Sequence, residues 1–371
     1  MKQLVGMPQN IKYPIMGRVT HKLVSKSKRK DYIRVVDKGE IEPGYLGIIT
    51  RNAPGNFART PLLYKVRDLE QLSDGDVISI EPTGIVNVLY QKESDDNSIL
   101  VTERCDCACI MCPQPRVTVE EDKTELNLRL ISLIDKDTKC LGITGGEPTL
   151  VGDKLIDIIA TCKRRLPNTD LILLTNGISL SDFDYVRKLV LINHPALTID
   201  VALYADTDTE HNRIIRANGF FKTIKGLYNL AWFEQKVGIR IVMHKLTYQR
   251  LYQLAEFIYH NFPFVFHIAF MQMETVGLAE ENIEKLWIDP HDYNQQLQRA
   301  VLYLARREMN VSIYNAQLCV LPRTLWKYAR KSISSWKNIY LDECDKCHYR
   351  EVCGGLFASS SEKHSEYIKP L

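Results

Sequence analysis

The chain has 371 residues, of which 45% are hydrophobic and 25% are charged. These are ordinary globular values, and they exclude a disordered, collagen-like or purely coiled-coil chain. The 48 Lys and Arg residues against 45 Asp and Glu give a net charge of +3, which is too balanced to indicate a nucleic acid as partner.

The ten cysteines are the unusual feature of the composition. Because the chain is long and its cysteines are clustered, metal binding is a better prediction than the disulfides of a small secreted protein. The opening segment has no apolar core of signal-peptide length, and no run approaches the roughly 18 apolar residues that a membrane helix needs. We therefore expect a cytoplasmic protein with reduced thiols and no membrane partner.

Residues 1–95 are expected to form a small β-rich domain, since short β-type runs alternate there with turn signals such as Glu42-Pro43-Gly44. The predicted strands are Tyr32–Val36, Leu46–Thr50, Val77–Ile80 and Ile85–Tyr90. A basic run follows the first twenty residues: Lys22, Lys26, Lys28, Arg29 and Lys30. A solvated surface is its expected role, and binding of an acidic partner is the alternative.

Residues 96–288 alternate between apolar β-type runs and segments of helical periodicity, which predicts βαβ units around a parallel sheet. The predicted strands are Ile99–Thr102, Cys140–Thr144, Leu171–Thr175, Leu197–Leu203, Gly238–His244 and Val265–Met271. The predicted helices between them are Leu126–Ile134, Leu155–Cys162, Phe183–Val190, Ile224–Phe233 and Leu251–Tyr259. Six such units predict a (β/α)6 partial barrel, with a doubly wound sheet as the alternative. In either α/β architecture, ligands are expected at the carboxyl ends of the strands.

Residues 289–371 are expected to form a third domain. A helix is predicted over Asp289–Met309, and the tail beyond it is rich in loops and holds four of the ten cysteines. It has few long apolar runs, so something other than a large core is expected to organise it.

Residues 105–112 read CDCACIMC, directly after the first strand of the predicted sheet. Cys105, Cys109 and Cys112 have the spacing C-x3-C-x2-C, and three close thiolates in a loop suit a soft metal or an iron–sulfur cluster. Since a [4Fe–4S] cluster normally has four ligands, three thiolates would leave one iron open for a small molecule. Cys107 could be a fourth ligand, a zinc ligand or a spare thiol, and short-range geometry favours three ligands plus a spare. A zinc site is the alternative for the whole loop.

The second predicted strand ends in Gly145-Gly146-Glu147-Pro148. Two glycines allow the backbone to approach a ligand closely, Glu147 supplies an acceptor, and Pro148 stiffens the turn. An ordinary strand-to-helix turn is the alternative. Polar residues follow the later strands as well, and a central binding site would need them at one rim: Thr175, Asn176, Tyr204, Asp206 and His244. For any single one of them, a satisfied rim residue is an equally good interpretation.

The four cysteines of the tail have the pattern C-x24-C-x2-C-x5-C: Cys319, Cys344, Cys347 and Cys353. Four thiolates can close a tetrahedral zinc site or ligate a cluster fully. We favour iron–sulfur over zinc here because the central domain already has a candidate cluster loop. Cys140 and Cys162 are expected to be ordinary buried thiols.

The C-x3-C-x2-C loop followed by GGEP resembles the radical S-adenosylmethionine (SAM) superfamily, over about residues 100–273. The resemblance implies a (β/α)6 partial barrel in which Cys105, Cys109 and Cys112 hold a [4Fe–4S] cluster and SAM binds the open iron. It implies SAM contacts for Gly145, Gly146, Glu147, Thr175 and Asn176. Tyr204 and His244 are weaker candidates for such contacts. The family often has an aromatic residue where this chain has Met111.

The same resemblance implies a chemistry. An electron from a donor such as flavodoxin or ferredoxin cleaves SAM to methionine and a 5′-deoxyadenosyl radical, which takes a hydrogen atom from the substrate. No acid–base pair is needed for that step, and the sequence identifies no catalytic side chain.

The tail resembles the auxiliary-cluster domains, of SPASM or the shorter twitch type, that follow the barrel in peptide-modifying radical SAM enzymes. Across nearly the whole chain the resemblance extends to the HxsC maturases of the His-Xaa-Ser system, on the segments Asp76–Ile78, Met111–Pro115, Ser332–Lys337 and Cys353–Ser360. It implies a small peptide or protein substrate and a second radical SAM protein of the HxsB type. A radical SAM enzyme acting on a small molecule or nucleoside is one alternative, and a non-catalytic zinc or iron–sulfur interaction protein is another.

Overall fold

The computed structural model describes residues 4–37, 42–52, 60–114, 117, 122–331 and 338–371. Pro115 and the segment Ser332–Lys337, both part of the resemblance above, lie outside this range. The chain divides into two compact units. The first comprises Met1–Ile99, Lys123–Leu141 and Thr161–Thr169, and the second comprises Leu100–Asp122, Gly142–Ala160 and Asp170–Leu371.

The first unit contains an eight-stranded sheet whose strand order is β1-β8-β7-β3-β4-β5-β6-β2. The strands are β1 (Leu4–Val5), β2 (Met7–Gln9), β3 (Ile15–Thr20), β4 (Tyr32–Val36), β5 (Gly47–Thr50), β6 (Leu62–Tyr64), β7 (Val77–Ile80) and β8 (Ile85–Tyr90). The end strands β1 and β2 are separated in sequence by Gly6 alone, so the sheet curls round on itself. At Gly6 a side chain would lie 2.6 Å from Val66, which explains the glycine.

Three of the four strands predicted for this unit have the predicted bounds, and β5 begins one residue later. Strands β1, β2, β3 and β6 were missed, although Val19 of β3 and Leu63 of β6 are fully buried in the core that they share with Ile33 and Ile78. The prediction of a solvated basic run is wrong for Arg29. This side chain is buried, pairs with Glu42 and lies over the ring of Tyr45 at 4.9 Å. The four lysines of the run are exposed.

The second unit is built on a sheet with the strand order β16-β15-β14-β13-β12-β11-β10-β9, in which every pairing from β11 to β16 is parallel. The strands are β9 (Asn97–Leu100), β10 (Cys140–Thr144), β11 (Asp170–Thr175), β12 (Leu197–Ala202), β13 (Val237–Met243), β14 (His267–Gln272), β15 (Val311–Tyr314) and β16 (Ala329–Arg330). The predicted alternation of strands and helices around a parallel sheet is therefore confirmed.

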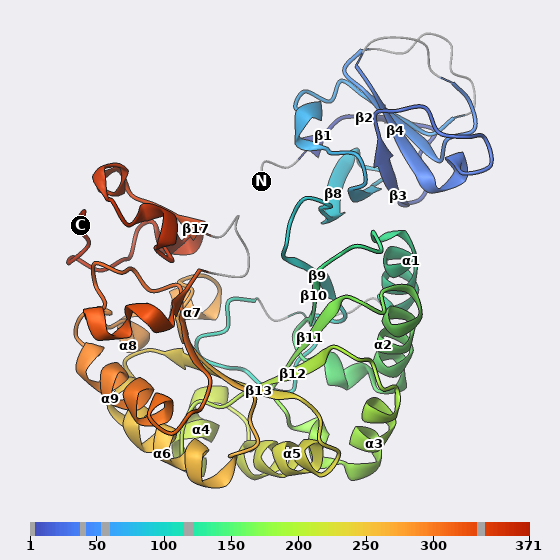
Figure 1. Cartoon of the computed structure of the whole chain (residues 1–371). Coiled ribbons are helices and arrows are strands. Elements are labelled where there is room, and N and C mark those ends of the chain that lie inside the picture. Colours follow the sequence, from blue (N-terminus) through green and yellow to red (C-terminus); the bar gives the residue numbers. More distant parts are fainter. Residues whose placement is uncertain (1–3, 38–41, 53–59, 115–116, 118–121, 332–337) are drawn as a thin grey trace. The chain divides into compact units, whose positions relative to one another are not determined.

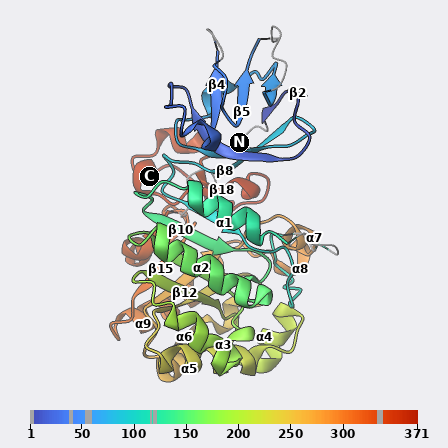
Figure 2. The ribbon, with the colours of Figure 1, turned by 90° about the vertical axis from the view of Figure 1, so that its right-hand side faces the viewer.

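Helices of the second unit lie outside the strands of its sheet in both views of the ribbon (Figure 1, Figure 2). The helices are α1 (Thr124–Leu133), which belongs to the first unit, and α2 (Asp153–Arg165), α3 (Phe183–Leu191), α4 (Asp208–Ile215), α5 (Phe220–Trp232), α6 (Leu251–Asn261), α7 (Leu278–Glu281), α8 (Ile283–Leu286) and α9 (Asn294–Ala305). Their apolar faces bury residues such as Leu155, Leu227 and Leu254 against the sheet. None of the helices in the described part of the chain is long and apolar enough to span a membrane.

The sheet extends further than the six predicted strands, because β15 and β16 come from the segment expected to be loop-rich. Val311–Tyr314 is a four-residue run, too short to stand out from the sequence around it. The predicted helix Asp289–Met309 is shorter in the structure, since α9 begins only at Asn294. In the tail, β17 (Asn338–Ile339) pairs antiparallel with β18 (Leu356–Phe357).

Candidate metal and cofactor site

The cysteine loop, residues 102–112, lies at the carboxyl edge of the second unit's sheet and is held there by main-chain hydrogen bonds. The amides of Ala108 and Ile110 each donate over 2.9 Å to the last turn of α4, and the carbonyl of Cys112 accepts from Leu278 of α7 over 2.9 Å. Two separate segments therefore fix the second half of the loop.

Gly145 and Gly146 make room for the polypeptide that enters this loop. A Cβ on Gly145 would lie 2.3 Å from the carbonyl oxygen of Thr102, and one on Gly146 would lie 2.2 Å from that of Arg104. Their neighbourhood is also hydrogen-bonded, since Gly146 donates to Thr102 and Glu147 donates to Arg104 over 2.8 and 2.7 Å. In this structure the two glycines thus allow the backbone of Thr102 and Arg104 to approach closely.

Glu147 links the ends of two neighbouring strands. Its side chain is 1% exposed and accepts four hydrogen bonds. Oε1 accepts from the amide and hydroxyl of Thr149 (3.0 and 2.6 Å) and from the hydroxyl of Thr175 (2.7 Å), and Oε2 accepts from the amide of Asn176 (2.6 Å). Burial raises the pKa of Glu147, and the four donors act in the opposite direction. The carboxylate therefore ties the end of β10 to the end of β11.

Asn176 carries this link on to the cysteine loop. Its side-chain amide donates to Asp106 over 2.6 Å and to the sulfur of Cys107 over 3.4 Å, while its carbonyl oxygen accepts from the amide of Ile178. The two strand ends and the middle of the loop are consequently one hydrogen-bonded network.

The loop thiols do not share one environment. Cys105 is exposed, Cys109 and Cys112 are half-buried, and Cys107 is buried. Among the described residues, the set with ligand atoms within 4.8 Å of one another is Cys105, Asp106 and Cys107. Hydrogen bonding to Cys107 raises the pKa of the Cys105 thiol, so metal binding would have to displace its proton.

Tyr204 faces the loop from the end of β12. It packs in one apolar cluster with Cys109, Ile110 and Met111, and its ring stacks on that of His211 at 5.9 Å. Burial raises the pKa of Tyr204 well above its usual range. His211 was missed by the sequence analysis, although its place seven residues after Tyr204 on the following helix was a usable signal. Its Nδ1 accepts from the amide of Tyr204 over 3.3 Å.

His244 follows β13 and is 1% exposed. Its Nδ1 accepts from the amide of Leu246 over 3.2 Å, so Nε2 carries the proton of the neutral ring. That Nε2 has no hydrogen-bond partner among the described residues, and burial lowers the pKa of His244 to about 4. A buried donor without a partner is uncommon and indicates a place where a ligand can bind.

The four tail cysteines line a single pocket. Main-chain amides already point at two of the sulfurs: Leu318 donates to Cys353 over 3.4 Å and Leu371 donates to Cys347 over 3.5 Å. Gly355 has a φ of +63°, which lets the chain turn directly after Cys353. Of the two cysteines expected to be buried, Cys162 is, and burial raises its pKa to about 12, whereas Cys140 is half-buried.

Comparison with known proteins identifies the central part of the chain. Residues 99–258 match the model of the Radical SAM superfamily. This segment, less than half of the chain, is similar to radical SAM domains. Its C-x3-C-x2-C loop and GGEP turn are the two motifs joined by the network described above.

Two curated relatives are GTP 3′,8-cyclases. The one from Petrotoga mobilis is 27% identical over 144 residues, 37% of this chain and 43% of the relative. The one from Desulforamulus reducens is 22% identical over 194 residues, 51% of this chain and 58% of the relative. The chain therefore spans about half the length of the curated relatives it matches.

Solved structures with a similar fold include Streptococcus suis SuiB bound to S-adenosylmethionine. It matches with a TM-score of 0.54 and 16% identity over 75% of this chain and 76% of that chain. Native anSMEcpe with bound AdoMet matches with a TM-score of 0.50 and 14% identity over 74% of this chain and 92% of that chain. At these identities the likeness shows the fold alone.

Proposed function

We propose that this chain is a radical SAM enzyme that modifies a ribosomally made peptide. The observation that carries the proposal is the network in which Glu147 and Asn176 join the GGEP turn to the C-x3-C-x2-C loop, within the segment that matches the superfamily. Two motifs 33 residues apart in sequence, counted from Cys112 to Gly145, serve one site.

Cys105, Cys109 and Cys112 would hold a [4Fe–4S] cluster, and Cys107 would remain a spare thiol. The donor set fits, because thiolates are the preferred ligands of such clusters and the loop offers them within eight residues. When bound, the cluster and SAM supply a 5′-deoxyadenosyl radical that abstracts a hydrogen atom from the substrate. Tyr204 and Met111 would exclude water on the apolar side of the loop, where Met111 takes the place of the aromatic residue usual in the family.

The hydrogen bonds in the site change which residues we propose as SAM contacts. With four donors on its carboxylate, Glu147 has little capacity left for the SAM amino group, so the main chain of Gly145–Glu147 would make that contact. Thr175 and Asn176 would act mainly by holding Glu147 and the cysteine loop in place. Tyr204 and His244 remain candidates for contacts to the rest of SAM or to the substrate.

Cys319, Cys344, Cys347 and Cys353 would hold an auxiliary iron–sulfur cluster, with zinc as the alternative. A single tetrahedral zinc with bonds of 2.3 Å would need its thiolates about 3.8 Å apart. No three of these thiols lie within 4.8 Å of one another in the described residues, although all four line the same pocket.

A peptide substrate is supported by the parts of the chain outside residues 99–258. A long substrate needs docking surface beyond the barrel, and this chain adds a separate β-rich unit and the cysteine-bearing tail. The finer assignment, to the HxsC maturases of the His-Xaa-Ser system, rests on the motif resemblance. It brings with it a partner of the HxsB type and a one-electron donor such as flavodoxin or ferredoxin.

A radical SAM enzyme acting on a nucleotide is the second candidate, because the two curated relatives are GTP 3′,8-cyclases. The two candidates differ in what is consumed, so incubation of the reduced enzyme with GTP or with a candidate peptide distinguishes them. A colourless protein with stoichiometric zinc would instead indicate a non-catalytic metal-binding protein.

The test is SAM cleavage by anaerobically reconstituted protein with dithionite, followed as 5′-deoxyadenosine by liquid chromatography. We expect a brown protein with about eight iron atoms per chain, the sum for two four-iron clusters. Cys105→Ala should abolish 5′-deoxyadenosine formation, and the matched variant Cys107→Ala should retain it. Equal loss in both variants would contradict the three-ligand assignment, and equal activity in both would remove Cys105 from the site.

A further inference from the structure

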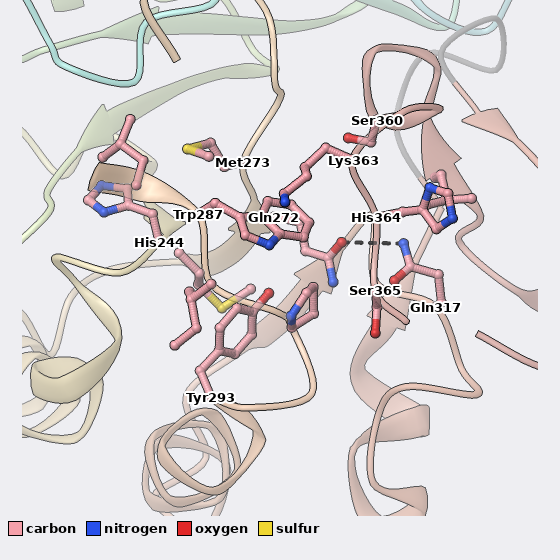
Figure 3. A pocket seen from close by; sticks show the side chains of 15 residues that line it. His244, Gln272, Met273, Trp287, Tyr293, Gln317, Ser360, Lys363, His364 and Ser365 are labelled. Atoms are coloured by element: carbon pink, nitrogen blue, oxygen red, sulfur yellow. Dashed lines mark hydrogen bonds between the residues drawn. The ribbon is translucent and has the colours of Figure 1, made fainter. Parts of the chain in front are cut away.

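A pocket in the second unit opens beside the carboxyl ends of β13 and β14, and neither motif of the radical SAM domain contributes to it. His244 and Gln272 come from the ends of these strands, Trp287 from the segment after α8, and Gln317 and Lys363 from the tail (Figure 3). Its empty space is about 390 Å³, counted with the solvent at its mouth.

The charge of the pocket is one-sided. None of its fifteen described lining residues is Asp or Glu, whereas Lys363 is a cation, and no described carboxylate forms an ion pair with it. Its ammonium group lies over the ring of Trp287 at 5.3 Å. One unpaired cation above an aromatic ring is a receptor for a single negative charge rather than for a triphosphate.

Buried neutral groups in the same pocket are also unsatisfied. The Nε2 proton of His244 has no acceptor and Oε1 of Gln317 has no donor among the described residues. The amide of Gln317 is fixed by bonds to Gly355 (2.9 Å) and Gln272 (3.3 Å), the second of which is drawn in Figure 3. A ligand that brings an acceptor oxygen and an amide N–H would satisfy both.

The tail segment that carries Lys363 is anchored on both sides of it. Before Lys363, the carbonyl of Ser359 accepts from Thr275 over 2.6 Å. After it, Asp289 accepts from the hydroxyl of Ser365 and the amide of Glu366 over 2.7 and 3.0 Å. Both oxygens of Asp289 are thereby engaged, and among the described residues Asp289 forms no ion pair with Lys363. The backbone on both sides of Lys363 is thus anchored, and its exposed side chain lines the pocket.

We propose that this pocket receives an acidic side chain, Asp or Glu, of the peptide substrate, with its carboxylate on Lys363 and its backbone amide toward Gln317. The inference depends on the proposed function, which makes the substrate a peptide. The pocket would act as a specificity site that sets which residue of the substrate lies near the cysteine loop.

The test uses the full chain with reconstituted clusters and SAM, without reductant, so that no turnover occurs. Fluorescein-labelled heptapeptide pools, random except for a central Glu, Gln or Lys, are titrated by fluorescence anisotropy. We expect the Glu pool to bind about tenfold more tightly than the Gln pool, the range of one charge-assisted contact. Lys363→Met should bring the two pools within twofold, and Lys363→Glu should reverse the order in favour of the Lys pool.

Lys285→Met is the matched control, because Lys285 is exposed two residues from Trp287 and does not line the pocket. It should keep the full preference, and a melting temperature equal to that of the parent shows that the Lys363 variants fold. An unchanged Glu preference in Lys363→Met, or none in the parent, would overturn the inference. Displacement of the Glu pool by GTP, dependent on Lys363, would assign the pocket to a phosphate instead. Peptide modification without a Glu preference would refute this inference alone, whereas a Glu preference without SAM cleavage would refute the proposed function alone.

Discussion

Replacement of Glu147 by Gln tests the network that joins the two motifs. The substitution keeps the size of the side chain and removes its charge. Glutamine can still present its carbonyl oxygen to the three donors on the Oε1 side, but its NH2 group then faces the amide of Asn176, which is also a donor.

The expected loss of stability has two sources: one hydrogen bond is replaced by two donors that face each other, and three hydrogen bonds are weakened. Loss of a hydrogen bond to a charged acceptor costs about 1.5–3 kcal/mol, and a buried N–H left without an acceptor adds to it. Conversion of the other three bonds from charged to neutral acceptors weakens them, while the removal of a buried charge, whose burial raises the pKa of Glu147, offsets part of the loss. We expect the free energy of unfolding to fall by about 3 kcal/mol.

Anaerobic urea unfolding followed by tryptophan fluorescence measures this, with Glu284→Gln on an exposed side chain as the control. Because Asn176 also holds Asp106 and Cys107, the same variant should retain less iron at the cysteine loop. A free energy of unfolding within 0.5 kcal/mol of the control, roughly the spread of neutral surface substitutions, together with full iron content, would refute the structural role of Glu147.

Two further predictions concern the tail and the buried histidine. Cys347→Ala should lower the iron content from about eight to about four atoms per chain and stop product formation, while 5′-deoxyadenosine is still formed; unchanged turnover on the peptide would show that the tail is only structural. For His244, burial lowers the pKa to about 4 from its ordinary 6.5, so between these values the unfolded chain binds a proton that the native chain does not. Its contribution to stability is therefore complete above pH 6.5 and lost as the pH falls, by about 2 kcal/mol between pH 7 and pH 5. In His244→Gln, the free energy of unfolding measured with urea should fall by about 2 kcal/mol less between pH 7 and pH 5 than in the parent. An equal fall in both proteins would show that the His244 ring is in water.

Much of the fold could be predicted from the sequence because strands and helices of the central region have strong, different periodicities. Cys140–Thr144 was predicted with its observed bounds. The four-residue β15 escaped, although the equally short β7 was predicted, because Val311–Tyr314 takes its identity from pairing with β14. Pairing between distant segments leaves no local signal.

The site was predictable as a set of residues and less so as a set of contacts. The spacing of the cysteines and the GGEP turn pointed to one rim, where the structure places them. The sequence did not show that the Glu147 carboxylate accepts hydrogen bonds from Thr149, Thr175 and Asn176. Thr175 and Asn176 lie at the end of another strand. Lys363 and Gln317 could not be linked to His244 from sequence, since they lie at least 73 residues beyond it, as counted from 244 to 317.

The central claim is that this chain takes a hydrogen atom from a peptide. The most direct measurement is mass spectrometry of 5′-deoxyadenosine and of a candidate peptide encoded beside this gene, with the peptide deuterated on carbon and the enzyme reduced anaerobically. We predict that deuterium from the peptide is found in 5′-deoxyadenosine and that the peptide loses the mass of two hydrogen atoms, as in cross-linking or desaturation. Unlabelled 5′-deoxyadenosine with an unchanged peptide, accompanied by consumption of GTP in a parallel reaction, would contradict the claim.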